Sequence, residues 1–189
     1  MGGQGTILAG EVLAKVGMEA GYDVKKSEVH GMAQRGGSVV SHVRWGDKVR
    51  SPLIPFHQAD FLLSFEKLES LRWIRFLSPN GTALVADHRV PPLSVSLGQF
   101  SYPEDDRVRE VLNAHASASQ LVPSFRIAQE LGNARINNVV MLGVFSHHIS
   151  VKEGVWRSVI EDSVPTRFMD LNLEAFGRGR GWAEGRRGA

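Results

Sequence analysis

The feature that most constrains the fold is an alternation of short apolar runs with segments of helical periodicity in the middle of the chain. Residues 61–65 and 82–86 are short apolar runs, of the kind found in strands covered on both faces. Residues 66–76 predict a helix between them, and residues 105–115 predict another after the second run. Strands separated by helices in this way indicate an α/β fold.

The N-terminal third adds one helix and two strands to this pattern. Residues 6–16 carry an apolar stripe at helical spacing, and Gly17 ends the predicted helix. Residues 24–29 predict a short strand, and residues 38–45 alternate as a half-buried strand does. A turn follows, with a return segment over residues 46–52, which predicts a β-hairpin. We therefore expect a three-layer α/β/α, Rossmann-like domain with a mixed sheet and a hairpin.

The C-terminal third predicts four helices and a tail. Residues 124–132 and the nearly all-apolar residues 137–149 predict the first two helices. A third begins at a capping box that opens at Ser150, and a short one spans about 170–176. Residues 178–189 combine glycine with arginine and offer little to bury, so we expect a disordered tail after one domain over residues 1–177.

The charge distribution argues against a nucleic-acid partner. The whole chain carries +2, but the last twelve residues contain four arginines against one glutamate, which leaves the remainder at −1. A body near neutrality has no large field to attract a phosphate backbone. No apolar run approaches the length of a membrane span, and the N-terminus lacks the features of a signal peptide. We therefore expect no membrane association and a cytoplasmic location.

The chain contains no cysteine. Cysteine-held iron–sulfur clusters, disulfides and thiolate nucleophiles all need that residue. The seven histidines are scattered and have no carboxylate spacing that predicts a zinc site. A G-x-S-x-G nucleophile elbow is also missing, so hydrolysis has no support in the sequence. We expect no metal ligands and no catalytic residue on this chain.

Two glycine-rich segments are candidate anion sites. The first is Gly2, Gly3, Gln4 and Gly5, directly before the first predicted helix. Backbone N–H groups and a helix N-terminus favour a phosphate there. The spacing matches neither a P-loop nor G-x-G-x-x-G, although Glu28 lies about where a ribose-binding acid would sit. A tight glycine turn packed on the sheet is the alternative.

The second candidate segment is Arg35, Gly36 and Gly37, in the polar loop between the two predicted strands. The guanidinium fork suits a phosphate or a carboxylate, and paired glycines allow close backbone approach. An exposed loop with a solvated arginine is the alternative. We expect both segments at the edge of the sheet where α/β proteins place ligands.

The combined motifs resemble those of a known family, the gamma-type domain of the 2-oxoacid:ferredoxin oxidoreductases, and within it the small (beta) subunits of the indolepyruvate type. The long motif over residues 27–39, which includes His30 to Gln34 before Arg35-Gly36-Gly37, indicates the arylpyruvate branch. Further matching positions are residues 2–5, 51–55, 59–60, 66, 172 and 175–177. The family places a strand before the Gly-Gly-Gln-Gly segment, and this sequence lacks one.

The resemblance implies a function and a set of partners. In such enzymes a 2-oxoacid is decarboxylated on thiamine diphosphate, two electrons pass through iron–sulfur clusters to ferredoxin, and the acyl group goes to coenzyme A. It implies that thiamine diphosphate and the clusters reside on a larger catalytic subunit. This chain would be a companion subunit, inactive alone, that helps to form the complex and the coenzyme A entrance.

Two other functions remain open from the residues. A free-standing dinucleotide-binding oxidoreductase would use the first glycine segment and Glu28, and would bind NAD as an isolated chain. An RNA-binding protein would use the Arg/Gly tail with Trp182, and its affinity would fall steeply with salt.

Overall fold

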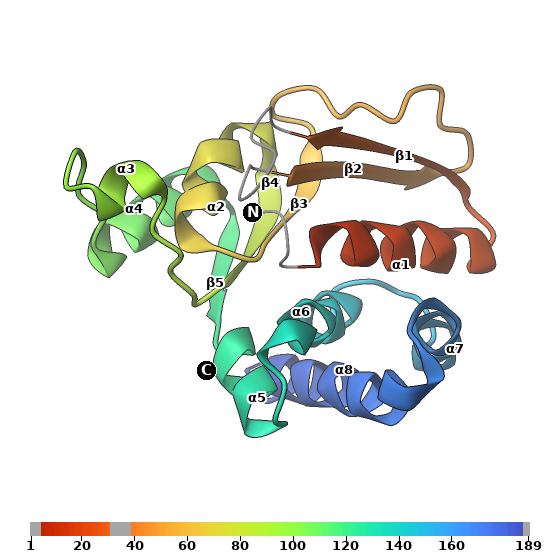
Figure 1. The fold of residues 1–189 in the computed structure, drawn as a ribbon. Coiled ribbons are helices and arrows are strands. Elements are labelled where there is room, and N and C mark those ends of the chain that lie inside the picture. The colour runs from red at the N-terminus through yellow and green to blue at the C-terminus, as the bar shows by residue number, and fades with distance from the viewer. Residues whose placement is uncertain (1–4, 31–38, 187–189) are drawn as a thin grey trace. The chain divides into compact units, whose positions relative to one another are not determined.

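The computed structural model describes residues 5–30 and 39–186 (Figure 1). Short 3-10 turns lie at Ile74–Phe76, Ala134–Ile136 and Thr166–Phe168. The helices and strands, in chain order, are α1 (Thr6–Glu19), β1 (Asp23–His30), β2 (Val39–Gly46), β3 (Ala59–Ser64), α2 (Lys67–Trp73), β4 (Leu77–Ala86), α3 (Leu93–Ser96), α4 (Asp105–His115), β5 (Ala118–Val122), α5 (Ser124–Glu130), α6 (Asn137–Ser146), α7 (Glu153–Ser163) and α8 (Met169–Glu184). Within the described residues, no helix combines the length and the apolar character needed to cross a membrane.

The chain divides into two compact units, where the sequence predicted one. Unit 1 comprises Met1–Ile54 and Ser124–Ala189, and unit 2 comprises Pro55–Pro123. The predicted α/β class, with antiparallel and parallel strands, is confirmed. The described strands are hydrogen bonded as the pair β1-β2 in unit 1 and as the sheet β3-β4-β5 in unit 2.

The hairpin of unit 1 joins different strands from those predicted. β1 pairs antiparallel with β2 from Asp23↔Gly46 to His30↔Val39. The segment after Gly46 is not a strand, so its predicted pairing with β2 was wrong. That segment instead crosses one face of the hairpin, where the Ile54 N–H donates to Nδ1 of the buried His42 at 3.1 Å. Pro52 and Pro55 lack the N–H groups that a ladder strand would need.

The other face of the hairpin packs on α1, which glycine makes possible. A β-carbon at Gly10 would lie 3.1 Å from the Ser41 side chain, and one at Gly17 would lie 2.6 Å from Trp45. The prediction that Gly17 ends the helix was wrong, because Gly17 allows close packing inside a helix that continues to Glu19. Gly21, at φ 87°, follows the helix.

The core of unit 1 centres on Trp156 of α7, which is fully buried. Its ring stacks on Phe176 at 6.1 Å between centroids and meets the edge of Phe145 at 5.9 Å. Trp45 of the hairpin lies 6.5 Å away. Aromatic contacts therefore join the hairpin to α6, α7 and α8.

The predicted disordered tail is largely helical. Residues 178–184 belong to α8, in which Gly179 and Ala183 are buried. Gly179 is not a helix breaker here, because it allows α8 to cross α6 closely. A β-carbon at Gly179 would lie 2.0 Å from the Val140 carbonyl oxygen, and one at Gly143 would lie 2.1 Å from that of Phe176. Residues 187–189 lie outside the described residues.

Unit 2 contains the parallel sheet, in which β4 lies between β3 and β5. Residues 83–86 of β4 are successively and fully buried, which confirms the prediction of a strand covered on both faces. Helices α2 and α4 contact each other as well as the sheet, so they cover the same face. α4 has the predicted bounds, and its Val108 and Leu112 are buried.

Two smaller sequence predictions were wrong. The Ser-Pro-Asn-Gly sequence of residues 78–81 is typical of a turn and predicts one, but these residues belong to β4, where the register with β3 shifts between Ala59 and Phe61. The capping box at Ser150 does not form: Lys152 occupies the N-cap of α7 and makes no side-chain capping bond. In both cases a short sequence signal predicted a local structure that the neighbouring strand or helix does not adopt.

Candidate functional site

Most of the predicted anion-site residues lie outside the described residues. These are Gly2, Gly3 and Gln4 of the first segment and all of Arg35, Gly36 and Gly37. Gly5 is described, and so are the elements that flank both segments: α1 for the first, and β1 and β2 for the second. The geometry of these flanks defines the candidate site.

Gly5 occupies a position that only glycine fits. Its φ of 75° lies in the left-handed region, and it forms the N-cap of α1. A β-carbon there would lie 2.3 Å from Nδ2 of Asn138. The Asn138 amide donates to the Gly5 carbonyl at 3.3 Å, and the same carbonyl accepts from the Ala9 N–H at 2.9 Å. The turn into α1 is thus held against α6.

The N-terminus of α1 lies at this contact. Its N-cap makes no side-chain bond, and its first turn has no acidic residue. Helix α6 differs, because the 3-10 turn Ala134–Ile136 runs directly into it and the Asn133 side chain caps that turn. Helix N-termini carry partial positive charge and free N–H donors, so the uncapped start of α1 favours a negatively charged ligand.

The open end of the hairpin, between β1 and β2, lies beside the N-terminus of α1. Gly10 of α1 lies against Ser41, near the start of β2, and Gly17 lies against Trp45, near its end. α1 and β2 therefore run in the same direction, and the N-terminus of α1 is next to the start of β2. The chain leaves β1 at His30 and re-enters at Val39 there. The structure thus brings the flanks of the two predicted segments together.

Glu28, the candidate ribose-binding acid, lies in β1 of this hairpin. Its carboxylate forms an ion pair with Lys26 at 2.9 Å, and the Lys26 side chain also reaches Gly10 of α1. Glu28 is paired across from Ser41 in the ladder. These contacts give Glu28 a structural role between hairpin and helix.

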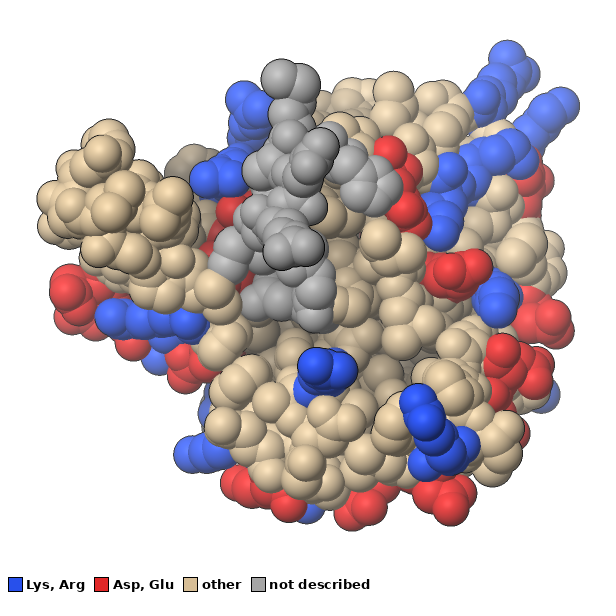
Figure 2. Space-filling model, in the orientation of Figure 1, with Lys and Arg blue, Asp and Glu red and all other residues tan. Residues whose placement is uncertain are grey.

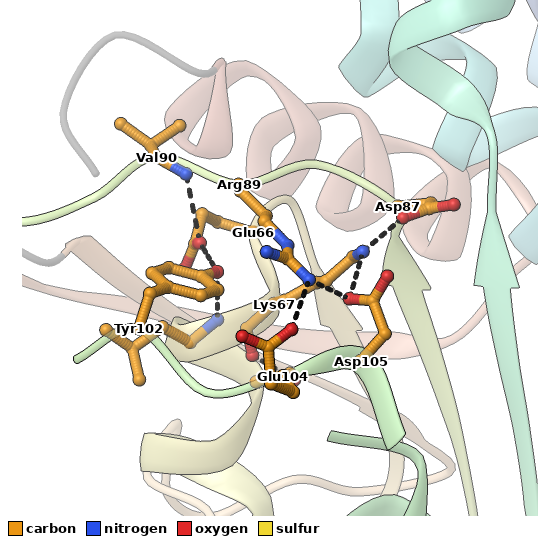
Figure 3. A network of polar contacts seen from close by, with 10 residues as sticks. Glu66, Lys67, Asp87, Arg89, Val90, Tyr102, Glu104 and Asp105 are labelled. Carbon is orange, nitrogen blue, oxygen red and sulfur yellow. Dashed lines mark hydrogen bonds and ion pairs between the residues drawn. The ribbon is translucent and has the colours of Figure 1, made fainter. Parts of the chain in front are cut away.

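Unit 2 holds a separate polar network at the carboxyl ends of its strands (Figure 3). Glu66 follows β3 and is 2% exposed. Its carboxylate accepts from the Glu69 N–H at 2.8 Å, from the Val90 N–H at 3.2 Å and from the Tyr102 hydroxyl. The Tyr102 oxygen in turn accepts from the Leu68 N–H at 3.1 Å. Burial and the Glu66 carboxylate raise the pKa of the Tyr102 phenol, which stays protonated as a donor.

Lys67, which is 3% exposed, forms the second half of the network. Its ammonium pairs with Asp87, directly after β4, and with Asp105 at 2.7 Å. Arg89 donates to the same Asp105 at 2.9 Å. Hydrogen bonds from Lys67 and Arg89 lower the pKa of Asp105 to about 2, so it is ionised at neutral pH.

The chemistry of this network is that of a structural anchor. Its two cations, Lys67 and Arg89, face more carboxylates than they can neutralise, since Glu104 also lies 3.8 Å from Arg89. A net negative edge repels phosphate. Within residues 5–30 and 39–186, no group of three or more His, Asp or Glu side chains is placed to hold a metal ion. The site that suits an anion is therefore the one in unit 1.

Sequence reasoning missed the residues that hold each site together. Asn138 is 2% exposed, and Glu66 was noted only as a family position. The pair Asn137-Asn138 at the start of an otherwise apolar helix is a signal that could have found the first. Nothing in the sequence links Tyr102 to Glu66, because 36 positions separate them.

Comparison with known proteins identifies the class that this α/β fold and its glycine-rich site define. A family model described as pyruvate ferredoxin/flavodoxin oxidoreductase matches residues 1–182. The chain belongs to this family. It is 36% identical over 179 residues to the indolepyruvate oxidoreductase subunit IorB of Thermococcus kodakarensis, covering 93% of this chain and 89% of the relative.

Solved structures share the fold. The gamma subunit of keto/oxoacid ferredoxin oxidoreductase from Geobacter sulfurreducens aligns with a TM-score of 0.71 at 22% identity, covering 98% of this chain and 95% of that one. The 2-oxoglutarate:ferredoxin oxidoreductase from Magnetococcus marinus aligns with a TM-score of 0.75 at 20% identity, covering all of this chain and 30% of that longer one. The same fold therefore occurs both as a separate chain and as part of a larger polypeptide.

Proposed function

We propose that this chain is the small subunit of a thiamine-diphosphate-dependent 2-oxoacid:ferredoxin oxidoreductase that acts on indolepyruvate or another arylpyruvate. The complex converts the oxoacid and coenzyme A into acyl-CoA and CO2 and reduces ferredoxin. The observation that carries this proposal is the near full-length similarity to a subunit of indolepyruvate oxidoreductase. The family resemblance of the motif over residues 27–39 supports the same branch.

The division of labour follows from the residues of this chain. Iron–sulfur clusters are held by cysteine thiolates, and these 189 residues contain none. The chain does not fit such a cluster, so we assign the clusters and thiamine diphosphate to a larger catalytic subunit. The isolated small subunit is then inactive, because it has no electron acceptor of its own.

We assign to this chain a role in holding the phosphates of coenzyme A. The residues are Gly2, Gly3, Gln4 and Gly5 with Arg35, Gly36 and Gly37. The uncapped N-terminus of α1 at Gly5, and the hairpin end beside it, support a phosphate at this place. Backbone N–H groups would hold the anion from one side and the Arg35 guanidinium from the other. The Magnetococcus structure is described with coenzyme A bound, which supports coenzyme A as a substrate of the complex.

The function is tested by anaerobic reconstitution of this chain with its larger subunit. Viologen dye reduction is measured with coenzyme A and, in turn, indolepyruvate, phenylpyruvate, pyruvate and 2-oxoglutarate. We expect the aryl oxoacids to be the preferred substrates and the isolated chain to be colourless and silent. Turnover by the isolated chain would refute its assignment as a companion subunit.

The site is tested by Arg35→Ala in the same complex. A hydrogen bond to a charged group contributes ~1.5–3 kcal/mol, so the Michaelis constant for coenzyme A should rise roughly ten- to a hundredfold. Arg107→Ala is the matched control, because Arg107 is exposed in unit 2 and, among the described residues, its ion pair is with Glu110 on its own helix. Loss of assembly would instead assign Arg35 to the subunit interface. If neither assembly nor the Michaelis constant changes, the site assignment is wrong.

A further inference from the structure

A single buried carboxylate holds both ends of an exposed loop in unit 2. We call residues 91–101 the Glu66 loop, because Oε1 of Glu66 accepts from the Val90 N–H on one side and from the Tyr102 hydroxyl on the other. Arg89 and Asp105, just outside these positions, form an ion pair at 2.9 Å that closes the stem again. Figure 3 shows Val90 and Tyr102, on the two sides of the stem, both in contact with Glu66.

The Glu66 loop is apolar and uncharged at its tip. Leu93, Leu97 and Phe100 are 74%, 63% and 70% exposed. Residues 91–101 contain no Lys, Arg, Asp or Glu. In Figure 2 the lobe at the left, where α3 lies in Figure 1, shows neither blue nor red on the visible face. Elsewhere the charged residues are spread over the surface, so this uncharged lobe is distinct.

The loop is also ordered by its own hydrogen bonds. The N–H groups of Val95 and Ser96 donate to the Pro92 carbonyl, and that of Leu97 donates to Leu93 at 2.8 Å. Gly98, at φ 72°, then turns the chain. Compact loops with close ends are frequently functional. Apolar side chains that are fixed before binding lose less conformational entropy when a partner covers them.

The exposed area decides between a second copy and a larger partner. A phenylalanine side chain carries about 150–250 Å² and a leucine somewhat less, so at 63–74% exposure the three residues present on the order of 400 Å². Two copies meeting through this loop alone would bury about 800 Å² in total, which is in the range of weak lattice contacts. A stable contact needs a partner that covers the loop and additional surface.

We propose that the Glu66 loop is an anchor that inserts Leu93, Leu97 and Phe100 into an apolar, uncharged groove of the larger catalytic subunit. This inference rests on the proposed function. The exposed area of the loop, which is too small for a stable contact between two copies, supports a larger partner. The stem around Glu66 positions the anchor and takes no part in chemistry.

The test measures binding of the purified chain to the immobilised larger subunit. Truncating central anchors of an interface typically costs at least tenfold in affinity, so Leu97→Ser with Phe100→Ser should weaken binding by about a hundredfold. Met18→Ser is the matched control, because Met18 is 55% exposed on α1 in unit 1. Tyr102→Phe removes one attachment of the stem while the ring remains, and should weaken binding by about three- to tenfold through lost preorganisation.

The outcomes separate this inference from the proposed function. If wild-type chain binds and the double variant binds equally well with an unchanged Tm, the anchor assignment is overturned while the subunit assignment stands. If wild-type chain does not bind the larger subunit, both are overturned. A concentration-dependent dimer of the isolated chain that the double variant abolishes would assign the loop to a second copy instead.

Discussion

Gly179→Ala isolates the close contact of α6 with α8. A β-carbon at this position would lie 2.0 Å from the Val140 carbonyl oxygen and 2.9 Å from the Val140 carbonyl carbon. Both are backbone atoms inside a helix, so no side-chain rotation relieves the contact. The helices must separate by roughly an ångström or more, because non-bonded carbon atoms rest near 3.5–4.0 Å. Such a separation loosens the packing of Phe176 on Trp156.

The change in the free energy of unfolding follows from two opposing contributions. Overpacking a well-packed core costs about 1–3 kcal/mol and occasionally more, and contact with rigid backbone places this site near the upper end. Alanine also gains about 1 kcal/mol of helix propensity over glycine. The net expectation for Gly179→Ala is a loss of roughly 2 kcal/mol in the free energy of unfolding. The same substitution at Gly181, where a β-carbon meets nothing within 4 Å, should gain up to about 1 kcal/mol.

The assay is urea unfolding of both variants, followed by circular dichroism and repeated as a thermal scan. Since 1 kcal/mol shifts Tm by about 2–4 °C for a chain of this size, the two variants should differ by roughly 6–12 °C. Equal stability of Gly179→Ala and Gly181→Ala would refute the packing argument. It would also favour the disordered tail that the arginine and glycine content predicts.

Two further predictions concern single residues in the two units. Gly5→Ala should lower the free energy of unfolding in urea by about 2 kcal/mol, since alanine is strained at positive φ and its β-carbon meets Asn138. Adding Asn138→Ala should restore part of that loss. If it restores none, backbone strain alone is responsible. Because hydrogen bonds from Lys67 and Arg89 lower the pKa of Asp105 from its ordinary value of 3.8 to about 2, its contribution to stability is present above pH 4 and lost as the pH falls towards 2. In the Asp105→Asn variant, the midpoint of urea unfolding should therefore change less between pH 4 and pH 2 than it does in the wild type. A midpoint that falls with pH as steeply as in the wild type would contradict this.

The elements were largely predictable where local pattern and packing agree. Helix α4 has apolar positions at helical spacing and acidic residues in its first turn, and both its bounds were predicted. The strands were found by the same kind of signal. The pairing was not, because β2 could form a hairpin with either neighbour on local evidence, and its true partner, β1, precedes it in sequence by the eight residues 31–38.

Glycine was the main source of error, since its sequence signal has two opposite meanings. Gly17 was taken to end a helix and Gly179 to lie in a disordered tail, yet both lie inside helices at close contacts. Only the identity of the neighbour, Trp45 in one case and Val140 in the other, distinguishes a contact glycine from a terminating one. Gly21 and Gly132 do have positive φ beyond helix ends. The role of Asn138 at Gly5 was equally invisible, because 133 positions separate the two residues.

Unit 1 is built from two segments that are separated in the sequence by unit 2, and this has a consequence for biosynthesis. α1 packs on α6 and α7, and α6 packs on α8, so the N-terminal helix finds its neighbours only after the last third of the chain has been made. Unit 2 is continuous between them and can acquire its parallel sheet first. During translation, the apolar face of α1 and the hairpin therefore remain exposed to solvent until α7 and α8 have left the ribosome. A truncated chain that ends at Pro123 should consequently, once released from the ribosome, bind chaperones that recognise exposed apolar surface through its first 54 residues, with unit 2 already protected from protease.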